Sequence, residues 1–236
     1  MKGFLLGFAL ILCSVLALCF FTDRSQFEFQ LLFWVMGYIG YLLICFTKAE
    51  KNILPKLVAM AVFIRLIACF SFPVLSDDIY RFVWDGELNL KGISVYEFMP
   101  SHIQDSTLQD QQVLFKNLNS KNYFSVYPPV SQMVFAIGAY IGKGIYWKAV
   151  FIKLILLFGE IGIIFLIGQM LKAHNKSKQK ILFYAYNPLV IIEICGNAHF
   201  EGLALLALLT TAYLIYRNKI WLTGFTFVSA VLIKLN

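Results

Sequence analysis

Long apolar runs, most of them close to 20 residues and almost free of charge, alternate with polar segments along this chain. A helix of that length crosses the ~30 Å hydrocarbon core of a bilayer. The pattern therefore predicts an all-α integral membrane protein, a bundle of about seven transmembrane helices. The predicted spans cover residues 3–21, 29–46, 54–75, 149–171, 180–196, 201–216 and 219–236.

Residues 76–148, between the third and fourth runs, are much more polar. We interpret them as an extracytoplasmic loop with short juxtamembrane helices, inside a single domain over residues 1–236. The weakly apolar stretch 128–142 follows Tyr127 and begins with two prolines. It is predicted to lie in the outer interface or to re-enter it, because a crossing there would separate the basic loops described next.

Short basic segments set the predicted orientation. Lysine and arginine concentrate in the cytoplasmic loops of membrane proteins, so we expect the N-terminus and these segments on the cytoplasmic side. Lys2 precedes an apolar run without an A-x-A cleavage site, which favours a retained first span over a secretory signal. The basic residues are Lys48, Lys51, Lys56, Lys172, Lys176, Lys178, Lys180, Arg217 and Lys219.

Composition supports lipid as the solvent. Of 236 residues, 60% are hydrophobic and 14% are charged, too few charges to cover a soluble domain of this length. The net charge of +7 is explained by the basic loops. No nucleic-acid-binding motif accompanies it, so no nucleic-acid partner is expected. The five cysteines are scattered through apolar runs without metal-ligand spacing and are interpreted as packing residues.

With this orientation, four polar segments meet on the outer face of the membrane. They are residues 76–81, 127–129, 196–201 and 234–236. Their convergence predicts a functional site that faces outward.

Asp77 and Asp78 are the candidate catalytic residues. If 77–85 is helical, Asp77, Arg81 and Asp85 share one face at i, i+4 and i+8. Arg81 would then keep one carboxylate ionised and leave another as a base or ligand. The alternative is a solvated helix cap with an ordinary surface ion pair. Adjacent aspartates also suit Mg²⁺ or Mn²⁺, so a metal site and a metal-free base both stay open.

The segment around Asn187-Pro188 interrupts a span, and polar residues follow it. Asn197, His199 and Glu201 are costly near hydrocarbon, which predicts a polar cavity at the outer turn, although His199 alone would suggest a packed imidazole. Lys234 has two interpretations, snorkelling to the interface or binding a phosphate.

Three more charged residues lie inside predicted spans. Arg65, Lys153 and Glu160 are interpreted as a buried ion pair or network rather than as catalytic groups.

Five motifs, in the order in which they occur along the chain, resemble those of membrane glycosyltransferases of the GT-C superfamily. The resemblance begins near Pro73 and is closest to bacterial polyprenol-phosphate-mannose-dependent mannosyltransferases. It is more distant to the catalytic subunit that adds the first mannose to GPI anchors. The motifs are Ser76–Phe82, Tyr127-Pro128-Pro129, Asn187-Pro188, Gly196–His199 and Lys234-Leu235-Asn236.

The resemblance implies a polyprenyl-phosphate sugar donor and a glycan or lipid acceptor outside the cytoplasm. The expected activity is mannose transfer. The expected location is a bacterial inner membrane. It also implies inversion, with Asp77 as general base and Asp78 as its support. Arg81, Tyr127, Asn197, His199, Glu201 and Lys234 are the expected donor-binding residues. Such enzymes usually have further spans after the lysine motif, so the chain is expected to be incomplete at its C-terminus.

Two other functions stay open at this level. A lipid-linked oligosaccharide flippase would also need intramembrane charges and a broken helix, but it predicts internal repeats, which the sequence lacks. A non-catalytic membrane scaffold would use the aspartates only to cap a helix. Mutating Asp77 separates the three, because only an enzyme should lose turnover while it stays folded.

Overall fold

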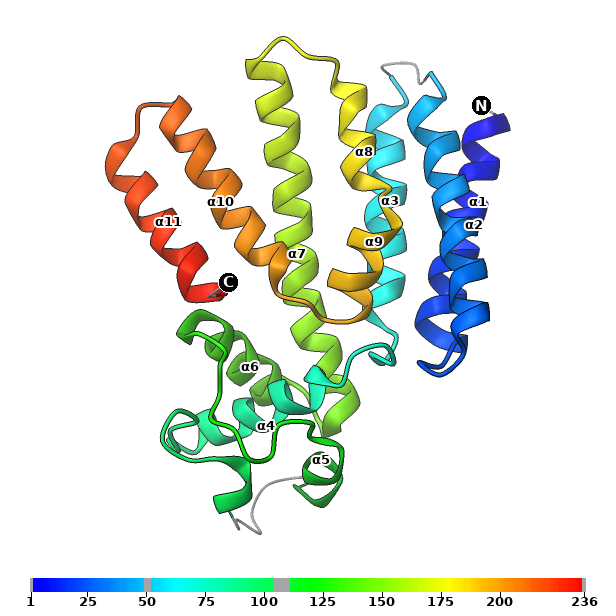
Figure 1. Cartoon of the computed structure of the whole chain (residues 1–236). Helices are drawn as coiled ribbons and strands as arrows, with labels where there is room; N and C mark the ends of the chain where they lie inside the picture. Colours follow the sequence, from blue (N-terminus) through cyan, green and yellow to red (C-terminus); the bar gives the residue numbers. More distant parts are fainter. Residues whose placement is uncertain (1, 49–51, 104–110, 235–236) are drawn as a thin grey trace.

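A computed structural model describes residues 2–48, 52–103 and 111–234, and all regular structure in these ranges is helical. Figure 1 shows most helices running side by side, with α4, α5 and α6 gathered at one end of this bundle. The bundle contains α1 (Lys2–Leu16) with the π-helical turn η1 (Ala17–Phe21), α2 (Phe27–Phe46), α3 (Leu54–Cys69), α7 (Gly144–Ala173), the turn η3 (Lys178–Ile181), α8 (Leu182–Ala185), α9 (Pro188–Val190), the π-helical turn η4 (Ile191–Gly196), α10 (Glu201–Tyr216) and α11 (Ile220–Ile233). The end layer contains α4 (Asp78–Leu90), the turn η2 (Pro100–His102), α5 (Gln111–Asn117) and α6 (Pro129–Ile141).

Within the residues that the structure describes, three helical segments are long and apolar enough to cross a membrane, namely Lys2–Phe21, α2 and α7. The segments Pro188–Gly196 and Glu201–Tyr216, bent by 115° where they meet, count as a fourth if each bent pair is one span. The expected seven spans are therefore not confirmed. α7 begins at Gly144, five residues before the predicted start, and α3 ends at Cys69 rather than at 75. The 13 residues of α6 rise only about 20 Å, less than the hydrocarbon thickness.

The helix ends follow local chemistry. Pro55 and Pro129 lie in the first turns of α3 and α6, where a missing N–H costs nothing. Asn175 and Asn218 adopt positive φ directly after α7 and α10, so the chain turns back there. Asn187 caps α9, because its Oδ1 accepts a 3.0 Å hydrogen bond from Leu189 N. The break predicted at Asn187-Pro188 is thus present.

α1 and α2 form a tightly packed hairpin. A Cβ atom on Gly7 would lie 2.7 Å from the Gly40 carbonyl oxygen, and one on Gly40 would lie 2.6 Å from the Gly7 carbonyl oxygen. Small residues at such crossings let two membrane helices approach closely where the hydrophobic effect does not drive association.

The intramembrane charges form two separate groups. Arg65 Nε donates to Glu160 Oε2 at 3.0 Å, and the Tyr184 hydroxyl donates to Glu160 Oε1 at 2.7 Å. Arg65 and Glu160 are fully buried, so the predicted buried ion pair is present. Lys153 does not join it. Its ammonium donates instead to the Ser71 and Gly196 carbonyl oxygens at 2.6 and 3.0 Å, which ties α7 to the outer ends of α3 and η4.

We expect Glu160→Leu to lower the free energy of unfolding by about 3–5 kcal/mol, because Arg65 would stay buried without its counter-charge. The double variant Arg65→Leu/Glu160→Leu should lose less, since it removes both charges. The measurement is thermal unfolding of purified protein in detergent. A double variant less stable than Glu160→Leu alone would contradict this account of the pair.

Candidate active site

The predicted site residues gather where one end of the bundle meets the end layer. Asp77 directly precedes α4, and Asp78 is its first residue. Tyr127 lies two residues before α6, and residues 197–200 connect η4 to α10. Lys234 follows α11, while Leu235 and Asn236 lie outside the described residues.

Aromatic rings hold three of these segments together. Phe82 of α4 stacks on Phe135 of α6, with ring centroids 4.4 Å apart. Phe200, from the turn before α10, packs edge-on against both rings at 5.4 and 5.1 Å. Tyr127 contacts Phe82 at 4.9 Å. These four rings form an aromatic cluster (Phe82, Tyr127, Phe135, Phe200), and such pairs add to the gain from burial itself.

α4 also carries a buried polar network centred on Asp85. Arg81 Nε donates to Asp85 Oδ1 at 2.7 Å, while Ser125 and Gln132 donate to Oδ2 at 2.6 and 2.9 Å. Arg81 Nη1 donates further to the Ser120 and Tyr123 carbonyl oxygens. The predicted i, i+4 pairing is thus present as Arg81–Asp85.

This network changes the interpretation of Arg81. Its side chain is 3% exposed and does not pair with Asp77 or Asp78 among the described ion pairs. Arg81 therefore orders the loop before α6 rather than facing the outer solvent.

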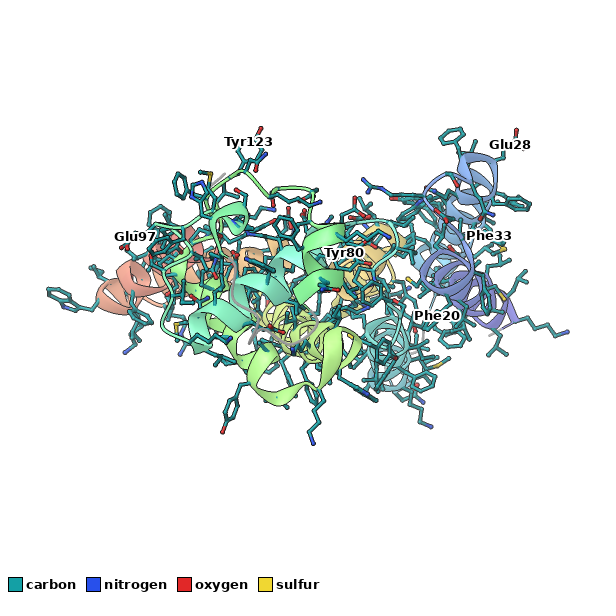
Figure 2. All side chains as sticks on the ribbon, turned by 90° about the horizontal axis from the view of Figure 1, so that it is seen from below. Phe20, Glu28, Phe33, Tyr80, Glu97 and Tyr123 are labelled. Carbon is teal, nitrogen blue, oxygen red and sulfur yellow. The ribbon has the colours of Figure 1, made fainter. Side chains whose placement is uncertain are left out.

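Asp77 pairs with a residue 53 positions earlier in the sequence. Arg24, in the turn between α1 and α2, donates from Nη1 to Asp77 Oδ2 at 2.5 Å. Both side chains are about half exposed. A cavity of about 580 Å³ lies beside this pair, between the α1–α2 turn and the α3–α4 connection. Figure 2 views this outer end and places Tyr80, which lines the cavity, between the loop layer and the N-terminal hairpin.

Asp78 has different neighbours. The Asn119 amide donates to Asp78 Oδ1 at 3.4 Å, and the Tyr127 hydroxyl is near enough for the same carboxylate to act on it electrostatically. The ion pairs between described residues include none to Asp78. Its carboxylate therefore accepts from an uncharged amide, whereas that of Asp77 is held by a guanidinium.

The turn after η4 brings His199 toward the same region. His199 Nδ1 lies 2.8 Å from Glu193 Oε2, and Asn197 Nδ2 donates to Glu193 Oε1 at 3.3 Å. Ala198 between them has φ of 62° and is fully buried, an uncommon conformation for a residue with a Cβ. Asn197 and His199, which were predicted to lie in a polar cavity at this turn, thus both contact the Glu193 carboxylate.

Glu201 and Lys234 form an ion pair that links the outer ends of α10 and α11. The Ser131 hydroxyl donates to the Ile233 carbonyl oxygen at 2.6 Å and attaches the end of α11 to α6. Lys234 is about a quarter exposed, so it stays accessible next to the loop layer.

Burial and local partners shift several acid–base equilibria here. Burial raises the pKa of Asp85 above its ordinary value, although Arg81, Ser125 and Gln132 act in the opposite direction. The hydrogen bond to Glu193 raises the pKa of His199, and the carboxylates of Glu201 and Asp78 contribute in the same direction. Burial and the neighbouring Asp78 carboxylate raise the pKa of Tyr127, so its hydroxyl stays a donor.

Asp77 and Asp78 are the residues that the sequence offers for a divalent ion. In residues 2–48, 52–103 and 111–234, no group of three or more His, Cys, Asp or Glu side chains is spaced to hold a metal ion. Asp77 already has a guanidinium partner. The protein residues present thus offer at most part of a coordination shell.

Sequence reasoning missed several partners of the predicted residues. Arg24 and Asn119 lie 53 and 41 residues from the aspartates that they contact. Ser125 and Gln132, which complete the Asp85 network, were also missed. The only local signal among these contacts was the i, i+4 spacing of Arg81 and Asp85.

Comparison with known proteins gives one family. The model of the MptA_B family, described as alpha-(1->6)-mannopyranosyltransferase, N-terminal domain, matches residues 18–236. Neither the curated proteins nor the solved structures gave a match.

The raised pKa of His199 predicts a stability that depends on pH. The unfolded imidazole has a pKa of about 6.5, and the folded pKa lies higher, so the stabilisation is complete below about pH 6.5 and is lost as pH rises through the folded pKa. We expect the melting temperature of the wild type to fall between about pH 6 and pH 8 more than that of His199→Gln. His102→Gln, which alters an exposed histidine, is the matched control. An equal pH dependence of the melting temperature in wild type and His199→Gln would refute the contribution of protonated His199 to stability.

Proposed function

The chain belongs to the MptA_B family of alpha-(1->6)-mannopyranosyltransferases, and on this premise we propose that it transfers mannose from a polyprenyl-phosphate donor to an extracytoplasmic glycan or lipid. The family makes the protein a glycosyltransferase. The observation that supports the site is the convergence of Asp78, Tyr127 and His199 from three separate segments.

The proposed topology has seven spans in a bacterial inner membrane, with the site facing outward. Two observations support it. The basic connections after α2, α7 and α10 all lie at the end of the bundle opposite to α4–α6 (Figure 1), as expected for a cytoplasmic side. The end layer also contains short helices and loops, which a polar environment tolerates better than hydrocarbon does.

In the proposed reaction, Asp78 takes the proton of the acceptor hydroxyl while the acceptor oxygen attacks C1 of mannose. The bond from C1 to the phosphate oxygen breaks at the same time, and polyprenyl phosphate leaves with the bonding electrons. One displacement inverts C1, so an alpha product requires a beta-linked mannosyl phosphate. The phosphate is a good leaving group and needs charge stabilisation more than a strong acid.

Asp78 is assigned as the base because its carboxylate accepts from the neutral Asn119 amide, whereas Asp77 would have to leave or share its ion pair with Arg24 before it accepts a proton. Asp77 then supports the site. This reverses the roles that the family resemblance suggested for the two residues. The motif itself does not say which aspartate is the base, because the two residues differ in the partners that their carboxylates contact.

Cations for the donor phosphate come from two neighbouring segments. His199, whose pKa is raised, carries positive charge over a wider pH range than an ordinary imidazole. Lys234 is accessible at the end of α11, paired only with the half-exposed Glu201 among the described ion pairs. Both stand on segments held by the aromatic cluster or by the Ser131–Ile233 hydrogen bond. Asn197 orients Glu193, which in turn holds His199.

The test is transfer of radiolabelled mannose from polyprenyl-phosphate-mannose to membrane acceptors, with all variants at matched expression. Asp78→Asn should lower transfer about 10²–10⁴-fold, the usual contribution of a general base. Glu97→Gln, which alters an exposed outer carboxylate far from the N-terminal hairpin in Figure 2, should leave transfer unchanged. Full transfer by both Asp77→Asn and Asp78→Asn would reject this site. A larger loss in Asp77→Asn would restore the opposite assignment.

The variant Arg24→Gln tests whether Arg24 only holds Asp77 in place or acts on a substrate itself. Because the Arg24–Asp77 pair is half exposed, it contributes at most about 1 kcal/mol, so transfer should fall by less than about fivefold. The same radiolabel assay measures it, with Lys56→Gln at the opposite end of the bundle as control. A loss as large as that of Asp78→Asn would show that Arg24 itself acts on a substrate.

A further inference from the structure

A groove lies between α3 and α7, at the end of the bundle away from the candidate active site. It encloses about 390 Å³ and is lined mainly by apolar side chains. Leu54, Val58 and Val62 line it from α3 at helical spacing, so they form one continuous face.

The facing wall belongs to α7 and the turn that follows it. Ile161, Phe165, Gly168 and Lys172 line the groove at spacings of three or four residues, which also places them on one face. From Ile161 to Lys172 this wall rises about 17 Å, roughly half of the hydrocarbon thickness. The groove is thus long and apolar, and it extends from the basic end toward the middle of the bundle.

The mouth of the groove is basic. Lys172 closes the lining on α7, Lys178 approaches from η3, and the Gln169 amide lies one turn below Lys172. The lining contains no acidic residue, and neither ammonium takes part in an ion pair between described residues. Two positive charges above an apolar channel are complementary to a molecule with an anionic head and a hydrocarbon tail.

We propose that this groove binds one anionic phospholipid, with its phosphate between Lys172 and Lys178 and an acyl chain along α3 and α7. The bound lipid comes from the leaflet on the side of the basic turns, the cytoplasmic leaflet in the topology proposed above. Such a lipid fills a space that the protein's own side chains leave open. It also neutralises two lysines that line the same groove.

An apolar helix from a partner protein fits the groove less well than a lipid does. A helix would cover the wall between Leu54 and Phe165, but it would offer the two ammonium groups no counter-charge unless it carried acidic residues there. A zwitterionic lipid would supply the acyl chain without the net charge. The lysines therefore distinguish these occupants.

Gly168 provides a way to fill the groove from inside. A Cβ atom at this position would meet only Ile181 Cδ1, at 3.6 Å, which is ordinary van der Waals contact. Gly168→Leu therefore fits the helix without a backbone clash and places a side chain where the acyl chain would lie.

The experiment measures lipid retained by the purified full chain in detergent, counted by native mass spectrometry after addition of dioleoyl-phosphatidylglycerol or dioleoyl-phosphatidylcholine. We expect one phosphatidylglycerol per chain and much less phosphatidylcholine. Lys172→Gln/Lys178→Gln should retain phosphatidylglycerol about thirtyfold more weakly, since each lysine near an anionic surface contributes roughly a factor of five. Lys176→Gln/Lys180→Gln, two lysines of the same loop outside the groove, should bind as the wild type does.

Three results would overturn the proposal. The first is equal retention of both lipids, the second an equal loss in the two lysine double variants, and the third undiminished retention in folded Gly168→Leu. If Gly168→Leu does not fold, the two surface lysine double variants still decide the question. Lipid retention is measured without sugar transfer, so a failure here is distinct from a failure of the proposed glycosyltransferase site.

Discussion

The packing of four aromatic rings at the outer end of the bundle positions the rest of the candidate site. Phe82, Tyr127, Phe135 and Phe200 come from α4, the segment before α6, α6 itself and the turn before α10. Each ring lies within a few residues of a polar group in the site. Because the rings are close-packed, the segments that carry Asp78 and His199 cannot move apart without opening an apolar core. The proposed site therefore depends on the packing of rings that carry no polar atom apart from the Tyr127 hydroxyl.

Burial separates the acidic residues of this part of the protein into two sets. Asp85 and Glu160 are buried, each with an arginine and further donors, and such pairs specify how helices meet. Asp77 and Asp78, at the start of α4, stay partly exposed and are the residues that we propose for the chemistry. Burial and partners thus separate the two carboxylates that join helices from the two that we propose for the site.

The two ends of the bundle present different chemistry to the membrane. The end that carries α4–α6 combines carboxylates, an imidazole and a lysine on short helices and turns, which suits the proposed transfer between a lipid phosphate and a hydroxyl group. The opposite end presents basic turns and an apolar groove, which suits a structural lipid. α7 connects them: Lys153 near its outer half bonds the η4 turn that leads to His199, and Lys172 at its other end lines the groove mouth.

The amino-acid sequence alone determined what local patterns control. The apolar runs predicted helices and a membrane environment, and the ordered motifs indicated the mannosyltransferase family. The helix break predicted at Asn187-Pro188 is present, and Pro128 and Pro129 mark the start of α6. Arg81 and Asp85 were recognisable because helical spacing alone brings them together. The tertiary structure decided the partners of Asp77 and Asp78, since Arg24 and Asn119 reach them only through helix crossings between distant segments. It also separated Lys153 from Glu160, although they lie two turns apart on one helix, because Ser71 and Gly196 offer closer acceptors. Spacing along a helix says which residues share a face, but the neighbouring elements decide what that face meets.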